Sequence, residues 1–280
     1  MDIRITPGKL TGVVTAIPSK SQAHRLLICA AFADSPTTLL CPETNRDIEA
    51  TVECLRALGA KIHRESFGFH VEPVREIPKN ALLPCRDSGS TLRFFLPIVG
   101  ALGVDATFLM EGRLPSRPLS PLWEEMERMG CCLSRPTANT LRCQGQLHGG
   151  EYTVSGNVSS QFITGLHFAL PLISGESTLK ITGRIESAPY IEMTKDALAH
   201  FGVAFKNNTI SGKASYRSPG RVVIEGDWSN GAFFHVANFL DNRLDVLGLN
   251  SNSIQGDSAV IEALAQLKNN ATIDATHIPD

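Results

Sequence analysis

The chain has 280 residues, of which 42% are hydrophobic and 19% charged, and its formal net charge is −2. This length and composition predict one large domain or two smaller ones, each able to bury a hydrophobic core. The near balance of 26 basic and 28 acidic residues argues against binding of nucleic acid or anionic membranes through overall charge. No stretch approaches 18 uninterrupted apolar residues, and Met1–Thr6 lacks the layout of a signal peptide. We therefore expect a cytosolic protein with neither a membrane nor a nucleic-acid partner.

The seven cysteines all lie in the first half of the chain and form no C-x-x-C pair. An odd number without paired spacing suits neither a disulfide framework nor a zinc site. We expect reduced thiols and no bound metal.

Four segments begin with a serine and continue into an apolar helical pattern. They open at Ser21, Ser90, Ser160 and Ser229, which are 69, 70 and 69 residues apart. Repetition at a fixed period indicates one structural unit copied along the chain.

Two further landmarks keep this register. A β-rich segment with a threonine follows each of the first three helices, and a second helix then ends at a glycine, where a left-handed conformation is favoured. The landmarks are Thr38, Thr107 and Thr178 for the strands, and Gly59, Gly130 and Gly202 for the helix ends. More strands close each unit, for example at Gly68–Glu72 and Ala214–Arg217. The pattern predicts an α/β fold of repeated units.

The repeat also predicts the domain organisation. Three units fill residues 19–224 and form one complete domain. A fourth unit begins near 225, and the same step would carry it to about 295. We therefore expect the polypeptide to be a fragment or to be completed by another chain. Residues 1–18, strand-like around Gly12–Ile17, are expected to pair with residues 225–280 as a partial second domain.

The helix starts carry hydroxyl and basic side chains. A helix N-terminus offers unpaired N–H groups and partial positive charge, which together favour anions. Each serine taken alone is better explained as an N-cap. Lys20 is less easily explained, because a cation at a helix start opposes the helix dipole unless an anion is nearby. With Arg25 and the loop arginines Arg113 and Arg117, it predicts a local site for a ligand with several acidic groups.

Seven stretches in this order resemble the 5-enolpyruvylshikimate-3-phosphate (EPSP) synthase family, which belongs to the enolpyruvyl transferases. They are Pro18–Arg25, Asn45–Ile48, Asp87–Arg93, Gly112–Pro118, Ser159–Phe162, Glu186–Tyr190 and His277–Asp280. The resemblance implies two domains of βαβαββ units with pseudo-threefold symmetry, arranged as an inside-out α/β barrel. It also implies that the second domain is incomplete here.

The family transfers the enolpyruvyl group of phosphoenolpyruvate to the 5-hydroxyl of shikimate 3-phosphate, with release of phosphate and without a cofactor. The resemblance implies a monomer with these two small-molecule substrates. The residues that it assigns to shikimate 3-phosphate are Lys20, Ser21, Arg25, Ser159, Ser160, Gln161, Ser187, Tyr190 and Asp280.

The resemblance assigns phosphoenolpyruvate to Lys20, Gly89, Arg113 and Gln161. Asp280 would accept the proton of the 5-hydroxyl, and Lys20 would stabilise the charge that develops. Addition to the enol double bond needs both an acid and a base, which makes these residue types reasonable. Without the resemblance, Asp280 is simply a carboxylate at the end of the sequence.

The chain departs from the family pattern at Asp87, Ser90 and Phe94. The cationic residues that the family uses farther along its sequence have no counterpart here, so we expect these 280 residues alone to turn over poorly. Two alternatives stay open: a non-catalytic binder of shikimate 3-phosphate, and a UDP-N-acetylglucosamine enolpyruvyl transferase. The second usually carries a cysteine in the loop around Arg113–Pro115, where this chain has none.

Overall fold

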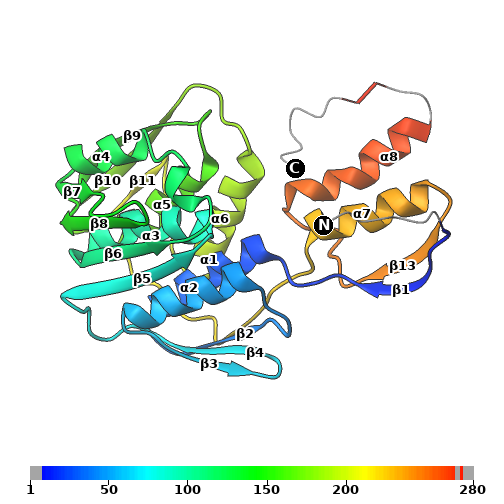
Figure 1. Cartoon of the computed structure of the whole chain (residues 1–280), viewed down its shortest axis with the longest axis horizontal. Helices are drawn as coiled ribbons and strands as arrows, with labels where there is room; N and C mark the ends of the chain where they lie inside the picture. The colour runs from blue at the N-terminus through cyan, green and yellow to red at the C-terminus, as the bar shows by residue number, and fades with distance from the viewer. Residues whose placement is uncertain (1–7, 269–271, 274–280) are drawn as a thin grey trace. The chain divides into compact units, whose positions relative to one another are not determined.

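The computed structural model describes residues 8–268 and 272–273 (Figure 1). The chain divides into two compact units: Lys20–Ile224, and Met1–Ser19 together with Glu225–Asp280. We call them the larger and the smaller unit. Whether the smaller unit is an incomplete domain stays a prediction.

The larger unit, whose residues are all described, contains three sheets of the same plan. The first has the order β12–β2–β4–β3, the second β5–β6–β8–β7 and the third β11–β10–β9. In each, a central strand has one parallel and one antiparallel neighbour. The strands of the first two sheets are β2 (Thr37–Leu40), β3 (Lys61–Glu65), β4 (Gly68–Glu72), β12 (Arg221–Val223), β5 (Asn80–Arg86), β6 (Asp105–Met110), β7 (Cys131–Ser134) and β8 (Thr140–Gly145). Those of the third are β9 (Gly150–Ser155), β10 (Ser177–Thr182) and β11 (Thr209–Ile210).

The parallel pairs join successive units of the repeat. The last strand of the first unit, β5, pairs with the central strand of the second, and β9 pairs in the same way with β10. The last strand of the third unit, β12, returns to the central strand of the first, where Arg221 lies opposite Thr38. The three units therefore close on themselves, which confirms the predicted repeat. The three threonine landmarks all lie in central strands.

Each unit opens with a buried helix: α1 (Lys20–Ala31), α3 (Gly89–Leu102) and α5 (Ser160–Ala169). The second helices are α2 (Arg46–Ala57), α4 (Leu122–Arg128) and α6 (Ala188–His200), and short 3₁₀ turns lie at Leu114–Ser116 and Leu170–Leu172. Helices that are apolar on nearly every side are stable only when neighbours surround them. The glycines after the second helices, Gly59, Gly130 and Gly202, have φ values of 103°, 111° and 73°, as predicted.

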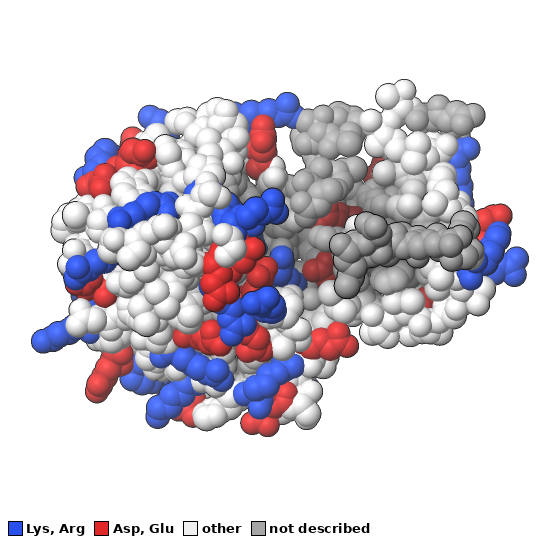
Figure 2. Space-filling model, in the orientation of Figure 1, with Lys and Arg blue, Asp and Glu red and all other residues white. Residues whose placement is uncertain are grey.

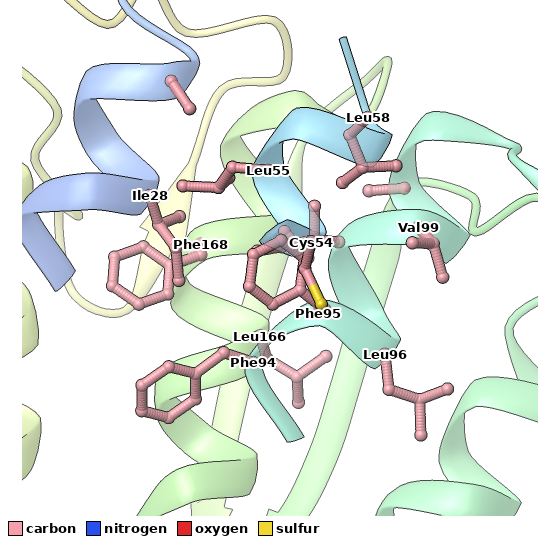
Figure 3. Close-up of a cluster of buried hydrophobic side chains, with 14 of the residues drawn as sticks. Ile28, Cys54, Leu55, Leu58, Phe94, Phe95, Leu96, Val99, Leu166 and Phe168 are labelled. Atoms are coloured by element: carbon pink, nitrogen blue, oxygen red, sulfur yellow. The ribbon is translucent and has the colours of Figure 1, made fainter. Parts of the chain in front are cut away.

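The core of the larger unit forms where these helices pack together. Figure 3 shows Phe94 and Phe95 of α3 beside Leu166 and Phe168 of α5. The two helices approach closely at Gly165, where a Cβ would lie 2.4 Å from the Arg93 carbonyl oxygen. Only glycine allows this backbone-to-backbone contact.

The strand predicted at Ala214–Arg217 is wrong. This segment makes one isolated bridge, between Tyr216 and Ala33, and its amides bond outside any sheet, for example from Ala214 to the Pro171 carbonyl (2.9 Å). Tyr216 is buried, and its hydroxyl donates to the Phe168 carbonyl at 3.1 Å. The apolar pattern here reflects a loop that covers the core.

The smaller unit contains β1 (Thr11–Thr15) and β13 (Arg243–Leu247), which pair in parallel, as the sequence predicted for residues before 18. Its helices are α7 (Trp228–Phe239) and α8 (Val260–Lys268), with a 3₁₀ turn at Gly256–Ala259. Buried Gln255 joins the two chain segments that lead into and out of the larger unit, because its side chain bonds both Ser19 Oγ (3.2 Å) and the Gly226 carbonyl (2.8 Å).

Charges of both signs are mixed over the face of the larger unit drawn in Figure 2. This agrees with the near-zero net charge. None of the helices in the described ranges has the length and apolarity needed to cross a membrane.

Candidate functional site

Arg25 lies in the second turn of α1 and forms hydrogen bonds to the starts of two helices, α1 and α6. It is 3% exposed, and its guanidinium donates to the carbonyls of Ser21 (2.6 Å) and Tyr190 (2.9 Å) and to Thr194 Oγ1 (2.9 Å). Its Cζ lies 5.4 Å from the Phe94 ring centroid and 5.9 Å from that of Tyr190. Burial lowers the pKa of Arg25 to about 10, so it stays charged at neutral pH. The structure therefore brings together three predicted site residues: Ser21, Arg25 and Tyr190.

Lys20 is the first residue of α1, and its Nζ lies 3.1 Å from Asp47 Oδ2 in the first turn of α2. The Asp47 carboxylate is thus an anion near this lysine that the protein itself supplies. Both side chains are partly exposed, and an ion pair of this kind contributes about 1 kcal/mol or less.

The start of α3 carries a second group of cations. Gly89 is its first residue, and a Cβ there would lie 2.7 Å from Arg117 Nη1 and 3.1 Å from Arg93 Nη1. Arg93 donates to Gln161 Oε1 (2.6 Å), and the Gln161 amide nitrogen donates to Ser90 Oγ (3.0 Å). Burial, and to a lesser extent the charge of Arg117, lower the pKa of Arg93. Two guanidinium groups thus lie against the amino end of a helix, an arrangement that favours a negative ligand.

The structure does not bring Arg113 into this group through any contact among the described residues. Its side chain is exposed, and its backbone carbonyl accepts from Ser116 in the short turn at Leu114–Ser116. Arg117, from the same loop, lies at the start of α3 instead. Asp87 packs under the loop: a Cβ at Gly112 (φ 56°) would lie 3.0 Å from its carboxyl group.

The remaining predicted residues lie at the starts of α5 and α6. Ser159 is the N-cap of α5, and its Oγ accepts a hydrogen bond from the backbone N–H of Gln161 at 3.2 Å. Ser160 is the first helical residue. Ser187 precedes α6 with φ 55° and ψ 40°, and its side chain makes no capping bond. A non-glycine residue held in the left-handed region is uncommon and often marks a functional position. Asp280 lies outside the described residues.

The amino ends of five helices are joined by side-chain contacts in a ring, which we call the helix-start ring. The links are Lys20–Asp47 (α1–α2), Thr91–Asp47 (α3–α2), Gln161–Ser90 (α5–α3), Thr164–Thr194 (α5–α6) and Arg25–Tyr190 (α1–α6). The first helices of the three units thus point their N-termini toward one region, as the repeat predicted. Their partial positive charges add to those of Arg25 and Arg93, while Lys20 is paired with Asp47 and Arg117 Nη2 lies 4.0 Å from Asp87 Oδ1.

A family model described as EPSP synthase (3-phosphoshikimate 1-carboxyvinyltransferase) matches residues 5–278. The chain belongs to the EPSP synthase family. A curated relative named 3-phosphoshikimate 1-carboxyvinyltransferase, from Clostridium perfringens strain SM101, is 39% identical over 268 residues, covering 93% of this chain and 63% of the relative. Another with that name, from Clostridium botulinum strain Alaska E43, is 39% identical over 276 residues, covering 94% of this chain and 64% of the relative. The chain therefore spans just under two thirds of the length of these relatives.

The fold is also that of solved EPSP synthases. A structure of EPSP synthase from Acinetobacter baumannii superposes with a TM-score of 0.76 at 21% identity, covering 94% of this chain and 61% of that one. This agrees with the mixed α/β fold predicted from the repeat.

Sequence reasoning gave no substrate role to Asp47 or Arg93, whereas it placed Arg117 with Arg113 in a site for an acidic ligand. Asp47 and Arg93 belong to stretches that resemble the family, but nothing in the spacing shows that one holds Lys20 and the other holds Gln161.

Proposed function

We propose that this chain carries the shikimate 3-phosphate site of an enolpyruvyl transferase. The reaction joins the enolpyruvyl group of phosphoenolpyruvate to the 5-hydroxyl of shikimate 3-phosphate and releases phosphate. The observation that supports this most strongly is the ring of helix N-termini with buried Arg25. Both substrates carry phosphate and carboxylate groups, and fixed N–H groups and guanidinium groups complement such charges.

Shikimate 3-phosphate would lie across the starts of α1, α5 and α6. In this proposal Ser21 and Arg25 hold its carboxylate and ring oxygens, with Lys20 beside them. Ser159, Ser160 and Ser187 hold the 3-phosphate, which suits the capping position of Ser159 and the left-handed backbone of Ser187. Tyr190, whose carbonyl already accepts from Arg25, would lie beside the substrate ring.

Phosphoenolpyruvate would lie at the start of α3. Lys20, the Gly89 N–H, Gln161 and Arg113 are its proposed contacts. Arg117 joins this set, because its guanidinium already lies at Gly89. The 5-hydroxyl adds to C2 of phosphoenolpyruvate while C3 takes a proton; loss of phosphate from C2 and of a C3 proton then restores the double bond. Asp280 is the proposed base for the hydroxyl, and Lys20 stabilises the developing charge.

Three further properties belong to the same proposal. The enzyme acts in the cytosol, works as a monomer and needs no cofactor. The absence of a long apolar helix from the described residues is compatible with the first of these.

Calorimetric titration of the 280-residue chain with shikimate 3-phosphate tests the proposal. We expect binding, and we expect Arg25→Ala to weaken it at least about thirtyfold, since a buried charged contact is worth about 2–5 kcal/mol. Arg56→Ala is the matched control: Arg56 also donates to a backbone carbonyl, that of Ile62, but at the far end of α2. Equal losses in the two variants, or no binding by the wild type, would contradict the proposal.

Phosphate release from phosphoenolpyruvate in the presence of shikimate 3-phosphate separates an enzyme from a binder. We expect these 280 residues to bind shikimate 3-phosphate and to release phosphate slowly. Binding of UDP-N-acetylglucosamine in place of shikimate 3-phosphate would instead favour the related transferase.

A further inference from the structure

A chain of buried side chains runs beneath the helix-start ring, from α1 through α2 to α3. His24 Nδ1 lies 2.7 Å from Thr51 Oγ1, which lies 2.9 Å from Thr91 Oγ1. The Thr91 hydroxyl donates to Ser88 Oγ at 2.8 Å. All four residues are at most 1% exposed. No member belongs to the proposed substrate contacts, yet the chain ends at Ser88, the N-cap of α3.

The contacts within this chain are satisfied by one consistent direction of donation, in which the Thr91 hydroxyl gives its one proton to Ser88 Oγ at 2.8 Å and not to the Asp47 carbonyl at 3.5 Å. Burial lowers the pKa of His24 to about 3, so its imidazole is neutral. With the proton on Nδ1, His24 donates to Thr51, Thr51 to Thr91, and Thr91 to Ser88. Ser88 Oγ also accepts the Thr91 amide at 3.3 Å, which caps α3 beside Gly89. The orientation of the cap is therefore coupled, bond by bond, to an imidazole on a different helix.

The position of His24 repeats that of Lys20 one turn deeper. Lys20 and His24 are four residues apart on α1, and Asp47 and Thr51 are four apart on α2, so each pair lies on one helix face. The Lys20–Asp47 ion pair is thus an outer link between the helices, and His24–Thr51 is an inner, neutral one. The inner link continues to the α3 cap through the Thr51–Thr91 contact at 2.9 Å, whereas the outer pair reaches Thr91 through the Asp47 carbonyl at the longer distance of 3.5 Å.

Packing alone does not account for a histidine here. Its Nε2 is buried and has no hydrogen-bond partner among the described residues, although the Phe94 ring lies edge-on 6.3 Å away. An unpaired buried polar atom is destabilising, so an apolar residue of similar size would make a more stable core. The ring nitrogen of His24 that does make a hydrogen bond is Nδ1, and it begins the chain of hydrogen bonds.

We propose that His24 is a positioning residue: through Thr51, Thr91 and Ser88 it fixes the amino end of α3, and with it Gly89, relative to Lys20 on α1. In terms of the proposed function, on which this inference rests, it aligns the phosphoenolpyruvate contacts of two units of the repeat. His24 itself touches no substrate.

The first measurement does not depend on activity. Hydrogen exchange of the Thr91 and Leu92 amides, which bond to Ser88 Oγ and to the Ser88 carbonyl, reports the α3 cap directly. We expect exchange to be at least about tenfold faster in His24→Phe, the equivalent of losing one hydrogen bond of about 1.4 kcal/mol. The matched control is His167→Phe. His167 is also fully buried with an unpartnered Nε2, but its Nδ1 bonds only to the Ile163 carbonyl of its own helix (2.9 Å).

Two more variants distinguish a positioning role of His24 from a general effect on the stability of the fold. His24→Asn can place an amide donor near the position of Nδ1 and should restore slow exchange at Thr91. Thr51→Val keeps the shape of the core, breaks the chain in the middle and should reproduce the effect of His24→Phe. If His24→Phe does not fold, Thr51→Val carries the test alone. Equal exchange at Thr91 in the wild type, Thr51→Val and His167→Phe would overturn the inference.

The second measurement is ligand binding to the same chain. With shikimate 3-phosphate saturating, we expect the half-saturating phosphoenolpyruvate concentration to rise about tenfold in Thr51→Val, while the dissociation constant of shikimate 3-phosphate changes less than about threefold. Equal losses for both ligands would overturn the positioning role. If the wild type binds neither ligand, the proposed function fails, and the exchange measurement still decides whether His24 holds the α3 cap.

Discussion

Phe94 and Phe233 occupy the same place in two copies of the repeat, four residues after Ser90 and Ser229, but their surroundings are opposite. Phe94 in α3 is 1% exposed, whereas Phe233 in α7 is 75% exposed. The helices have similar apolar sequences, so the difference does not arise within them. It arises because a repeat unit buries its apolar face only against neighbouring units.

The neighbours explain the contrast. α3 packs against α2 and α5 and lies over its own sheet, and nearly its whole length is buried. α7 has contacts with α8, β13 and the turn at Gly256–Ala259, and α8 has no buried residue. A cavity of about 430 Å³ lies between α7 and α8, lined in part by Phe239, Ile261 and Leu264. In the larger unit, by contrast, the three copies of the repeat pack against one another.

The largest expected effect is at the matched phenylalanines. Phe94→Ala should lower the free energy of unfolding of the larger unit by about 3–5 kcal/mol, because it leaves a cavity in a packed core. Phe233→Ala should change that of the smaller unit by less than about 0.5 kcal/mol. Each unit contains one tryptophan, Trp123 or Trp228, so urea unfolding followed by fluorescence in single-tryptophan backgrounds reports each one separately. A cost at Phe233 as large as at Phe94 would show that α7 is covered in solution.

The second test compares two helical glycines. A Cβ at Gly165 would lie 2.4 Å from a backbone oxygen of α3, which cannot move without separating the helices. At Gly231 in α7 it would meet the flexible Leu249 side chain at 2.7 Å. We expect Gly165→Ala to cost about 3 kcal/mol and Gly231→Ala about 1 kcal/mol or less, measured by the same unfolding assay. If Gly165→Ala were neutral, the close packing of α3 on α5 would not be what stabilises the larger unit.

The smallest expected effect, counted per histidine, is the decrease in the free energy of unfolding of the larger unit at acid pH. Burial lowers the pKa of His24 to about 3 and that of His167 to about 4, from 6.5. The unfolded chain therefore binds protons that the folded chain does not, so stability is full above pH 6.5 and falls as the pH is lowered toward the folded values. Between pH 7 and pH 5 each histidine should remove about 2 kcal/mol. His167→Phe should remove its share of this slope. An unchanged slope would mean that His167 is protonated in the fold.

Several features of the fold were predictable because the residue pattern that indicates each of them occurs in more than one copy of the repeat. The helix starts, the threonine strands and the positive-φ glycines recur at one spacing, so three copies support each assignment. Ala214–Arg217 was wrong because its alternating pattern has no matching copy to test it. Apolar side chains that cover a core from a loop alternate much as a strand does.

The candidate site was predictable in part. Residues of single motifs, such as Ser21 with Arg25 or Ser159 with Gln161, do lie together. Contacts between motifs were not accessible: the Lys20–Asp47 pair, the place of Arg117 at Gly89 and the return of β12 to β2 all join residues whose separation along the chain carries no periodic signal. Such contacts depend on how helices pack, which a single sequence does not encode locally.

The return of β12 to β2 has a consequence for how the polypeptide can be rearranged. Because the last strand of the larger unit lies beside its first, the chain leaves the smaller unit and re-enters it at adjoining points: the Ser19 amide donates to the Glu225 carbonyl at 2.8 Å. The larger unit is thus a cassette inserted between two touching residues of its host. It can be excised with its ends joined by a short linker, or permuted to begin at a surface turn, while every sheet of the cassette stays intact.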